Sequence, residues 1–290
     1  MFAMALRTWE VRTLVVAQER ELQPGRSVRD LFGFQLRVHR KRRGKSLAAL
    51  AVEINRSKTV LSNIETADRS IPPELPAELD EYFESDGIFT ALYPLVCLEG
   101  FPDWSRRFME LEALASTQRK FANGAFPGLW QTRRYGKRLL ELGLPRATPD
   151  QIEERWSARE SRQALLTRDE PPHIWVVLDE VTMRRAVGSP ETMREQISHV
   201  LDLTDGPNAV VQVLPFSSGG HGSMAGSITL LDFLDAPRAA YVEGYVVGQL
   251  LESPEQVAET SLNYDFIQAA ALPPKESRTW LRRVMEEFRV

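Results

Sequence analysis

Two short segments with apolar residues at helical spacing, 47–54 and 58–65, follow each other across a gap that leaves room only for a turn. Ser46 and Ser57 stand immediately before them, where a hydroxyl can accept hydrogen bonds from the free amides at the start of a helix. The recurring apolar residues are Leu47, Leu50, Ala51 and Ile54, then Val60, Leu61 and Ile64. The spacing predicts two short helices joined by a tight turn that begins at Asn55.

Further short helices are predicted on both sides of this pair. One is expected at residues 32–43, where Gly44 ends it, and another follows the two prolines at positions 72 and 73. Residues 31–90 are therefore predicted to form an all-α bundle. An extension of residues 1–30, with a helix expected at 5–20, precedes it.

Charge is distributed unevenly along the chain. Residues 31–70 contain nine Lys and Arg against three Asp and Glu, a net charge of +6. The whole chain has a formal net charge of -4, so the remainder carries -10. A basic segment attached to an acidic body is typical of a nucleic-acid-contacting module joined to a domain that does not touch nucleic acid.

The segment 58–65 has the features of a helix that enters the major groove of DNA. It is the second of two short helices joined by a tight turn, a serine precedes it, and its first residues are polar. The major groove admits one helix, and the positive end of the helix dipole favours nearby phosphates. We therefore expect the chain to bind double-stranded DNA.

This part of the sequence resembles the lambda-repressor-like, XRE-type helix-turn-helix family. The resemblance rests on residues 34–37, 46–51 and 57–65, and Glu65 matches the glutamate that closes the recognition helix of that family. Two departures are Ala48, where many members have glutamine, and residues 66–68, which replace a glycine turn. The base-contacting positions that the resemblance implies are Lys58, Thr59, Ser62 and Asn63.

The side chains at these positions suit the edges of bases. Asn can pair with adenine through two hydrogen bonds, Lys can donate to guanine, and a Thr methyl can contact thymine. Phosphate contacts are expected from basic or hydroxyl side chains around the turn. These are Arg43, Lys45, Arg56 and Ser57.

From residue 91 to the end the pattern is mixed, and we assign residues 91–290 to one larger domain. Helices are expected at 108–117, 134–142, 149–167, 190–203, 254–271 and 275–288. Strands are expected at 174–178, 209–214, 227–233 and 239–243. The predicted fold class is mainly α with an α+β C-terminal part, in which a small sheet lies in the mixed domain.

The C-terminal part also resembles a known domain. It is similar to the domain that follows an XRE-type headpiece in many actinobacterial regulators, including WhiJ-like developmental regulators, whose biochemical role is largely unassigned. Those regulators are often paired with a small partner protein and are sometimes described as antitoxin-like. The resemblance rests on residues 108–113, 127–132, 176–180, 211–216 and 225–227.

Two segments of this part contain residue types found in catalytic or metal-binding sites. The glycine-rich segment 217–223 contains His221 and three serines, but it has neither dinucleotide-binding nor phosphate-loop spacing. It is interpreted as a connection between strands, with a lid over a ligand pocket as the alternative. Asp179 and Glu180 end a strand, where a turn with a helix cap is expected. No catalytic residue, cofactor or metal site is assigned, so an enzyme is not expected.

Three functions from different classes remain open from the sequence. The leading one is a sequence-specific transcriptional regulator, a homodimer whose C-terminal domain senses a small molecule or a partner protein. The second is an antitoxin-like protein that sequesters a small partner encoded nearby and regulates its own operon. The third is an enzyme with a DNA-binding head. With the single Cys97 and no run of about 18 apolar residues, a cytoplasmic protein without a membrane partner is expected.

Overall fold

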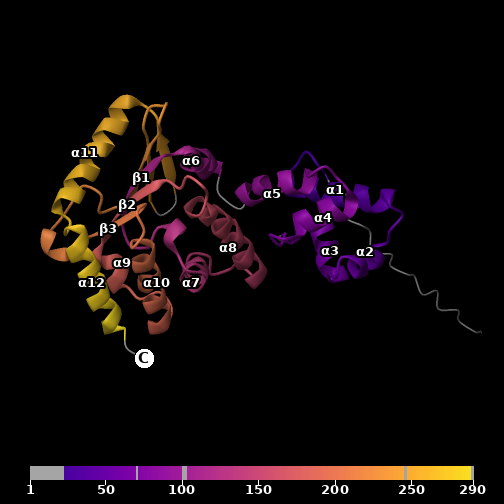
Figure 1. Ribbon diagram of the computed structural model, residues 1–290, viewed down its shortest axis with the longest axis horizontal. Coiled ribbons are helices and arrows are strands. Elements are labelled where there is room, and N and C mark those ends of the chain that lie inside the picture. The colour runs from indigo at the N-terminus through magenta and orange to yellow at the C-terminus, as the bar shows by residue number, and fades with distance from the viewer. Residues whose placement is uncertain (1–22, 70, 100–102, 245–246, 289–290) are drawn as a thin grey trace, which may run out of the picture.

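The computed structural model describes residues 23–69, 71–99, 103–244 and 247–288, and these form two bodies (Figure 1). The first is a bundle of helices, and the second is a larger domain of helices around a sheet. This arrangement confirms the predicted fold class. The helix expected at residues 5–20 lies outside the described residues.

The first body contains five helices among the described residues, and those of residues 47–53 and 58–65 start directly after Ser46 and Ser57, as predicted. The hydroxyl of Ser46 accepts from the amide of Ala49 at 3.1 Å, as expected for an N-cap. The first helix starts earlier than predicted because Ser27 caps it and accepts from the amide of Asp30 at 2.9 Å. The helices are α1 (Val28–Arg42), α2 (Leu47–Glu53), α3 (Lys58–Glu65), α4 (Leu75–Phe83) and α5 (Ile88–Glu99).

One apolar core holds these helices together. It includes the apolar residues that the sequence pattern placed at helical spacing, among them Phe32, Leu36, Leu50, Leu61, Ile64, Leu75 and Leu79. The sequence pattern did not reveal α5, which runs through the predicted domain boundary at residue 90. Phe89 and Val96 of α5 are buried in the same core, and the rings of Phe32 and Phe89 meet edge to face at 5.1 Å. The bundle therefore continues to residue 99.

Left-handed backbone occurs in several turns of the bundle, and two of these positions flank α3. Asn55, between α2 and α3, has φ 51°, a conformation that asparagine tolerates better than most residues. Ala67, just after α3, has φ 59° and stands where the family pattern has a glycine. An alanine Cβ crowds the backbone in this conformation, so Ala67 holds local strain.

We expect Ala67→Gly to stabilise the helical bundle by about 0.5–1 kcal/mol, because glycine adopts a positive φ without the Cβ clash. The measurement is hydrogen exchange of the α1 and α3 amides in the full chain. Ala49→Gly is the matched control, since Ala49 lies inside α2. That change should destabilise the same bundle by about 1 kcal/mol. Equal losses in both variants would contradict the strain at Ala67.

The second body is built on one six-stranded sheet with the order β3-β2-β1-β4-β5-β6. Strands β1, β2 and β3 run parallel, whereas β4, β5 and β6 follow as an antiparallel meander on the other side of β1. The strands are β1 (Thr117–Ala122), β2 (His173–Asp179), β3 (Ala209–Leu214), β4 (Ser227–Asp232), β5 (Ala239–Glu243) and β6 (Gly248–Leu251).

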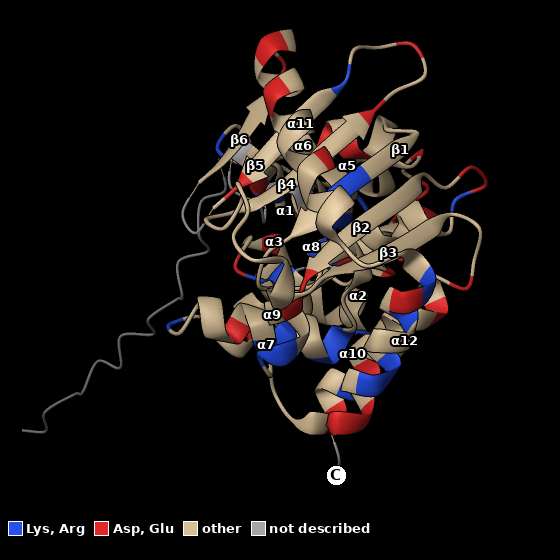
Figure 2. Cartoon of the chain, turned by 90° about the vertical axis from the view of Figure 1, so that its left-hand side faces the viewer, with Lys and Arg blue, Asp and Glu red and all other residues tan. Residues whose placement is uncertain are grey.

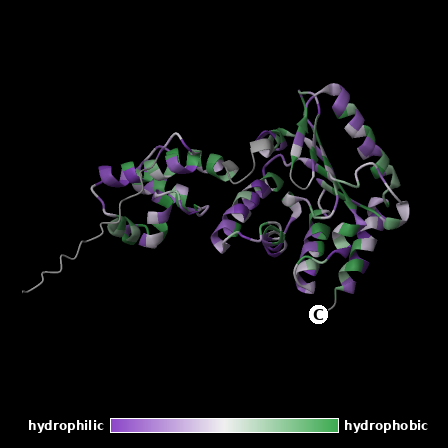
Figure 3. Ribbon diagram, turned by 180° about the vertical axis from the view of Figure 1, so that it is seen from behind, coloured by the Kyte–Doolittle hydropathy of each residue, from purple (hydrophilic) through white to green (hydrophobic). Residues whose placement is uncertain are grey.

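Helices cover both faces of this sheet (Figure 1). Along β1, Phe121 faces α11 (Pro254–Ala270), whereas Ala122 packs into the core with the helices on the opposite face. Figure 3 shows apolar residues concentrated on the strands and on parts of the flanking helices. The helices not yet given are α6 (Asp103–Leu114), α7 (Arg133–Gly143), α8 (Pro149–Gln163), α9 (Glu180–Arg184), α10 (Pro190–Leu203) and α12 (Pro274–Glu287).

The strand β1 is the main difference from the sequence prediction. A helix was expected at 108–117, but α6 ends at Leu114 and the chain then enters the sheet at Thr117. Among the described strands, β1 is the one that carries Lys or Arg, drawn blue in Figure 2. Because of these charges, the sequence pattern did not indicate a strand here, although β1 lies between β2 and β4. The short edge strand β6 was also not predicted.

The two bodies touch through α8 (Figure 1). A small pocket between them is lined from the bundle by Tyr93, Val96 and Cys97, and from α8 by Ser157 and Ala158. Burial raises the pKa of the Cys97 thiol, as expected for a sulfur inside such a contact. An ion pair between Arg29 of α1 and Glu154 of α8 lies beside this pocket.

None of the helices in the described ranges combines the length and the apolar character needed to cross a membrane.

Candidate functional site

The predicted recognition helix α3 presents its first residues to solvent. Lys58 and Thr59 are exposed, and Ser62 and Asn63 one turn later are half-buried. Within the described ranges, no hydrogen bond or ion pair engages these four side chains. Ser57 adopts the backbone conformation of an N-cap, but its hydroxyl makes no capping hydrogen bond. The polar groups at this end of α3 are therefore open to a ligand.

Glu65 fixes α3 to α1 from inside the protein. Its carboxylate accepts from Arg40 Nε at 2.8 Å and Arg40 Nη2 at 2.7 Å, and from Arg37 Nε at 2.9 Å. The side chain of Glu65 is 2% exposed and that of Arg40 7% exposed, so this is a buried, multiply hydrogen-bonded ion pair. The glutamate that the sequence resemblance singled out thus orients the recognition helix.

A close backbone approach completes this arrangement. Gly33 of α1 lies against the end of α3, where a Cβ would stand 2.6 Å from the carbonyl oxygen of Glu65. That distance is too short for any side chain, so glycine allows α1 and α3 to pack at this point. The recognition helix is therefore held by a salt bridge and by direct contact between backbones.

The three basic side chains predicted to contact phosphate each have a carboxylate partner in the free protein. Hydrogen bonding to Glu53 raises the pKa of Lys45, and hydrogen bonding to Glu78 raises that of Arg56. All three pairs are partly or largely solvent-exposed, where ion pairs contribute little net free energy and can exchange partners. The pairs are Lys45–Glu53 at 2.6 Å, Arg56–Glu78 at 2.6 Å and Arg43–Glu84 at 3.1 Å.

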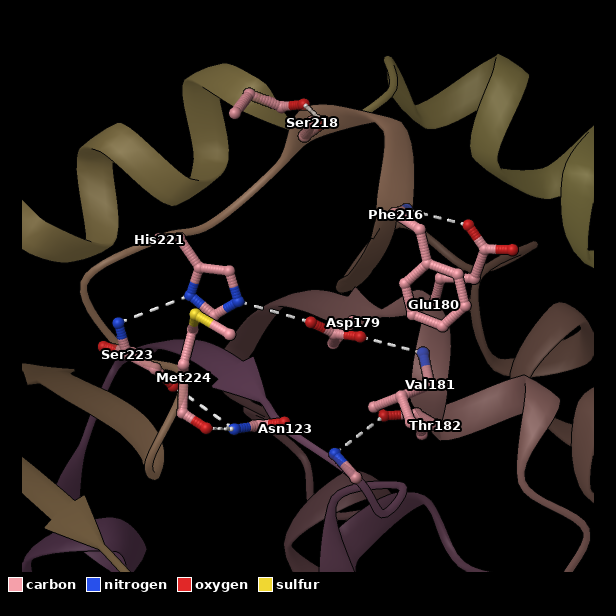
Figure 4. Close-up of polar contacts among 12 residues, drawn as sticks. Asn123, Asp179, Glu180, Val181, Thr182, Phe216, Ser218, His221, Ser223 and Met224 are labelled. Carbon is pink, nitrogen blue, oxygen red and sulfur yellow. Dashed lines mark hydrogen bonds and ion pairs between the residues drawn. The ribbon is translucent and has the colours of Figure 1, made fainter.

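The glycine-rich segment of the second body is tied to the end of β2 (Figure 4). Nε2 of His221 lies 3.3 Å from Oδ2 of Asp179, and the amide of Ser223 donates to Nδ1 at 3.3 Å. The other oxygen of Asp179 caps α9 by accepting from the amide of Val181 at 2.8 Å. Both ring nitrogens of His221 are thus used, which leaves none to activate a serine hydroxyl.

Neighbouring polar residues in Figure 4 also have structural partners. Glu180 accepts from the amide of Phe216 at 2.9 Å, and Ser218 donates to the carbonyl of Ala270 at 2.9 Å. His173 is exposed at the opposite end of β2 from Asp179. Across the described ranges, no three His, Cys, Asp or Glu side chains are grouped as a metal site requires.

A cavity of about 520 Å³ lies beside the sheet in the second body. Its wall is formed by side chains of α6, α8, β1 and β5 and by the connection after β1, where Trp130 lies. Ala225 and Gly226 contribute to the wall, but the glycine-rich segment 217–223 lines a separate cavity of about 270 Å³. The sequence did not indicate the larger cavity, because its polar residues are scattered over five helices and strands and the connection after β1.

A tightly packed bundle that exposes the polar start of its second short helix defines a helix-turn-helix DNA-binding protein. In agreement, residues 31–87 match the family described as a helix-turn-helix domain. Residues 105–283, more than half of the chain, match the family described as a domain of unknown function, DUF5753. The chain belongs to this DUF5753 family. Neither the curated proteins nor the solved structures contain a match to it.

Proposed function

We propose that this protein is a sequence-specific DNA-binding transcriptional regulator whose second domain dimerises and responds to a small ligand or a partner protein. The observation that carries the proposal is the polar start of α3, whose side chains have no partner among the described residues and which lies at the positive end of a helix held by Glu65. Lys58 and Thr59 can reach base edges there without breaking any interaction in the described structure. The kinship with actinobacterial WhiJ-like regulators is part of this proposal.

The experiment that tests DNA recognition is fluorescence anisotropy with DNA from upstream of the protein's own coding sequence, against scrambled DNA, at several salt concentrations. A specific regulator should prefer one DNA by about a thousandfold or more at physiological salt. Equal and strongly salt-dependent binding to both DNAs would contradict sequence-specific recognition.

Asn63→Ala should weaken binding to the preferred DNA by about 1–3 kcal/mol and relax the preference at one base pair, since an amide pairs with one base edge. Lys45→Ala is the matched comparison, because Lys45 is assigned to phosphate. It should weaken binding to all DNA alike and reduce the salt slope by less than about one unit, because Glu53 already neutralises Lys45 in the free protein. Anisotropy titrations on a set of singly substituted sites measure both. An unchanged base preference in Asn63→Ala would place the recognition surface elsewhere.

Dimerisation is proposed because one helix-turn-helix contacts few base pairs, and a two-fold dimer engages two half-sites about one DNA turn apart. Exposed apolar residues on α11 support a contact with a second copy: Leu262 and Phe266 are 56% and 67% exposed and lie one helical turn apart. Light scattering at micromolar concentration with DNA present measures the assembly. A monomer under those conditions would contradict the dimer.

The same exposed apolar residues of α11 favour a second candidate function, in which the domain binds a small partner protein encoded nearby, as an antitoxin does. Purification of the full chain with the neighbouring gene product distinguishes the two, because only this candidate requires a stable complex. The proposal assigns no catalytic activity, and the engagement of both ring nitrogens of His221 supports that assignment.

A further inference from the structure

The large cavity of the second body has an excess of positive charge. Four basic side chains line it, against two carboxylates. One of those carboxylates, Glu112, is buried and accepts from Arg162 Nε at 3.1 Å, so it neutralises Arg162. The other, Glu243, is exposed at the end of β5. The remaining basic residues are Lys120, Arg155 and Arg159.

Lys120 is the residue that a packed core does not explain. It lies in β1, between β2 and β4, and lines the cavity together with Gln118 and Ala122 of the same strand. Within the described residues, no hydrogen bond or ion pair reaches its ammonium group. Burial lowers the pKa of Lys120, because protein replaces the water that would solvate its charge. An inner strand normally carries an apolar residue at such a place.

Arg159 of α8 approaches the cavity in a fixed position. Its guanidinium donates to the side-chain carbonyl of Gln131, and the amide of Gln131 donates to the carbonyl of Phe126 at 2.6 Å. Burial and the nearby Arg162 lower the pKa of Arg159 to about 10. A guanidinium held by one of its five donors keeps the others available to a bound carboxylate or phosphate.

The cavity also has an apolar, aromatic side. Phe108 of α6 stacks on Tyr241 of β5, with ring centroids 4.1 Å apart and planes inclined by 16°. Phe126 and Trp130 line the cavity from the connection after β1. Its volume of about 520 Å³ falls in the range of about 300–1,000 Å³ that accommodates small organic ligands. Flat apolar surface beside two cations suits a molecule with a planar body and an anionic group.

We propose that this cavity binds a small aromatic anion, whose carboxylate or phosphate group contacts Lys120 and Arg159, and that this anion is the signal of the regulator. The proposal deepens the proposed function, because it names the class of effector that the second domain senses. Carboxylate and phosphate groups share the required chemistry. Both carry negatively charged oxygens that accept hydrogen bonds from ammonium and guanidinium groups.

Helix α8 connects this cavity to the DNA-binding body. Arg155, Arg159 and Arg162 line the cavity, whereas Ser157 and Ala158 of the same helix face α5. The ion pair of Glu154 with Arg29 adds a link from α8 to α1, which in turn holds the recognition helix. An anion that pulls on Arg159 therefore acts on a helix that contacts both bodies, as coupling between two sites requires.

The test uses the full chain and calorimetry without DNA, with phenyl phosphate and benzoate as anionic probes and benzyl alcohol and benzylamine as neutral and cationic ones. At least one anion should bind about tenfold or more tightly than either uncharged or cationic probe. The tighter of the two anions identifies the head group. Equal binding of all four probes would overturn the site.

Lys120→Met should weaken anion binding about tenfold or more, since it removes one of the cations that line the cavity. Lys275→Met, on the exposed start of α12, is the matched control and should leave binding unchanged. Circular dichroism checks folding, and Arg159→Met replaces Lys120→Met if the latter does not fold. Unchanged anion binding in the folded variant would overturn the assignment.

Anisotropy with the preferred DNA then tests the signal. A saturating anion should change the DNA affinity about fivefold or more in the natural chain and leave Lys120→Met unaffected. Anion binding with no change in DNA affinity would overturn the coupling through α8. Failure of the chain to prefer any DNA would contradict the proposed function alone, because the calorimetry requires no DNA.

Discussion

Replacing Glu65 by alanine should lower the free energy of unfolding of the helical bundle by about 3–5 kcal/mol. The loss is large because Arg40 is buried and would keep its charge without the Glu65 carboxylate, while Arg37 loses the same carboxylate. Hydrogen exchange of the α1 and α3 amides in the full chain measures it, since this reports the bundle separately from the second body.

Glu84→Ala is the matched control for this prediction. Glu84 also pairs with an arginine, Arg43, but its side chain is 86% exposed, so the ion pair is solvated. This variant should change the stability of the bundle by less than about 1 kcal/mol. Similar losses in Glu65→Ala and Glu84→Ala would show that the burial of the Glu65 pair is not what stabilises α3.

Trp156→Ala should destabilise the second body by about 3–5 kcal/mol, because it leaves a large cavity in a packed interior. Trp156 of α8 is 1% exposed, and its ring fills the space over Gly136 of α7, where an added Cβ would lie 2.1 Å from the ring. Urea denaturation followed by tryptophan fluorescence measures the loss, since Trp130, Trp175 and Trp280 also lie in this body.

Trp156→Phe provides the control within the same site. Phenylalanine retains most of the ring and removes an indole N–H that has no hydrogen-bond partner in the described structure. It should cost less than about 1.5 kcal/mol, in keeping with other conservative apolar replacements. Losses of equal size in the alanine and phenylalanine variants would mean that ring volume over Gly136 does not determine the packing of α7 on α8.

The helical bundle could be predicted closely from its sequence, because caps and apolar spacing act over a few residues. The serines before α2 and α3 and the apolar positions of both helices fixed their bounds almost to the residue. The carboxylate partners of Lys45 and Arg56 could not be predicted. These partners are Glu53 and Glu78, and only the folded arrangement brings their carboxylates close to the basic side chains.

The strand β1 shows why part of the second body could not be predicted. A strand between two others is recognised by apolar residues, but β1 contains Gln118, Arg119 and Lys120 in succession. Arg119 is satisfied on one face by Asp232 at 3.3 Å, and Lys120 lies in the cavity on the other. The hydrophobic pattern of the sequence therefore fails to predict a strand that supplies polar groups to a cavity. Such failures are expected at functional sites.

The carboxylates beside Lys45, Arg56 and Arg43 have a consequence for how the protein finds its target. These carboxylates act as built-in counterions, so DNA phosphates must displace them from the basic side chains. DNA binding therefore releases fewer salt ions than the charge of +6 over residues 31–70 suggests. Residence on arbitrary chromosomal DNA should be correspondingly short, while the proposed contacts from α3 to bases would be undiminished. A search among millions of competing sites then depends more on the bases than on the charge of the backbone.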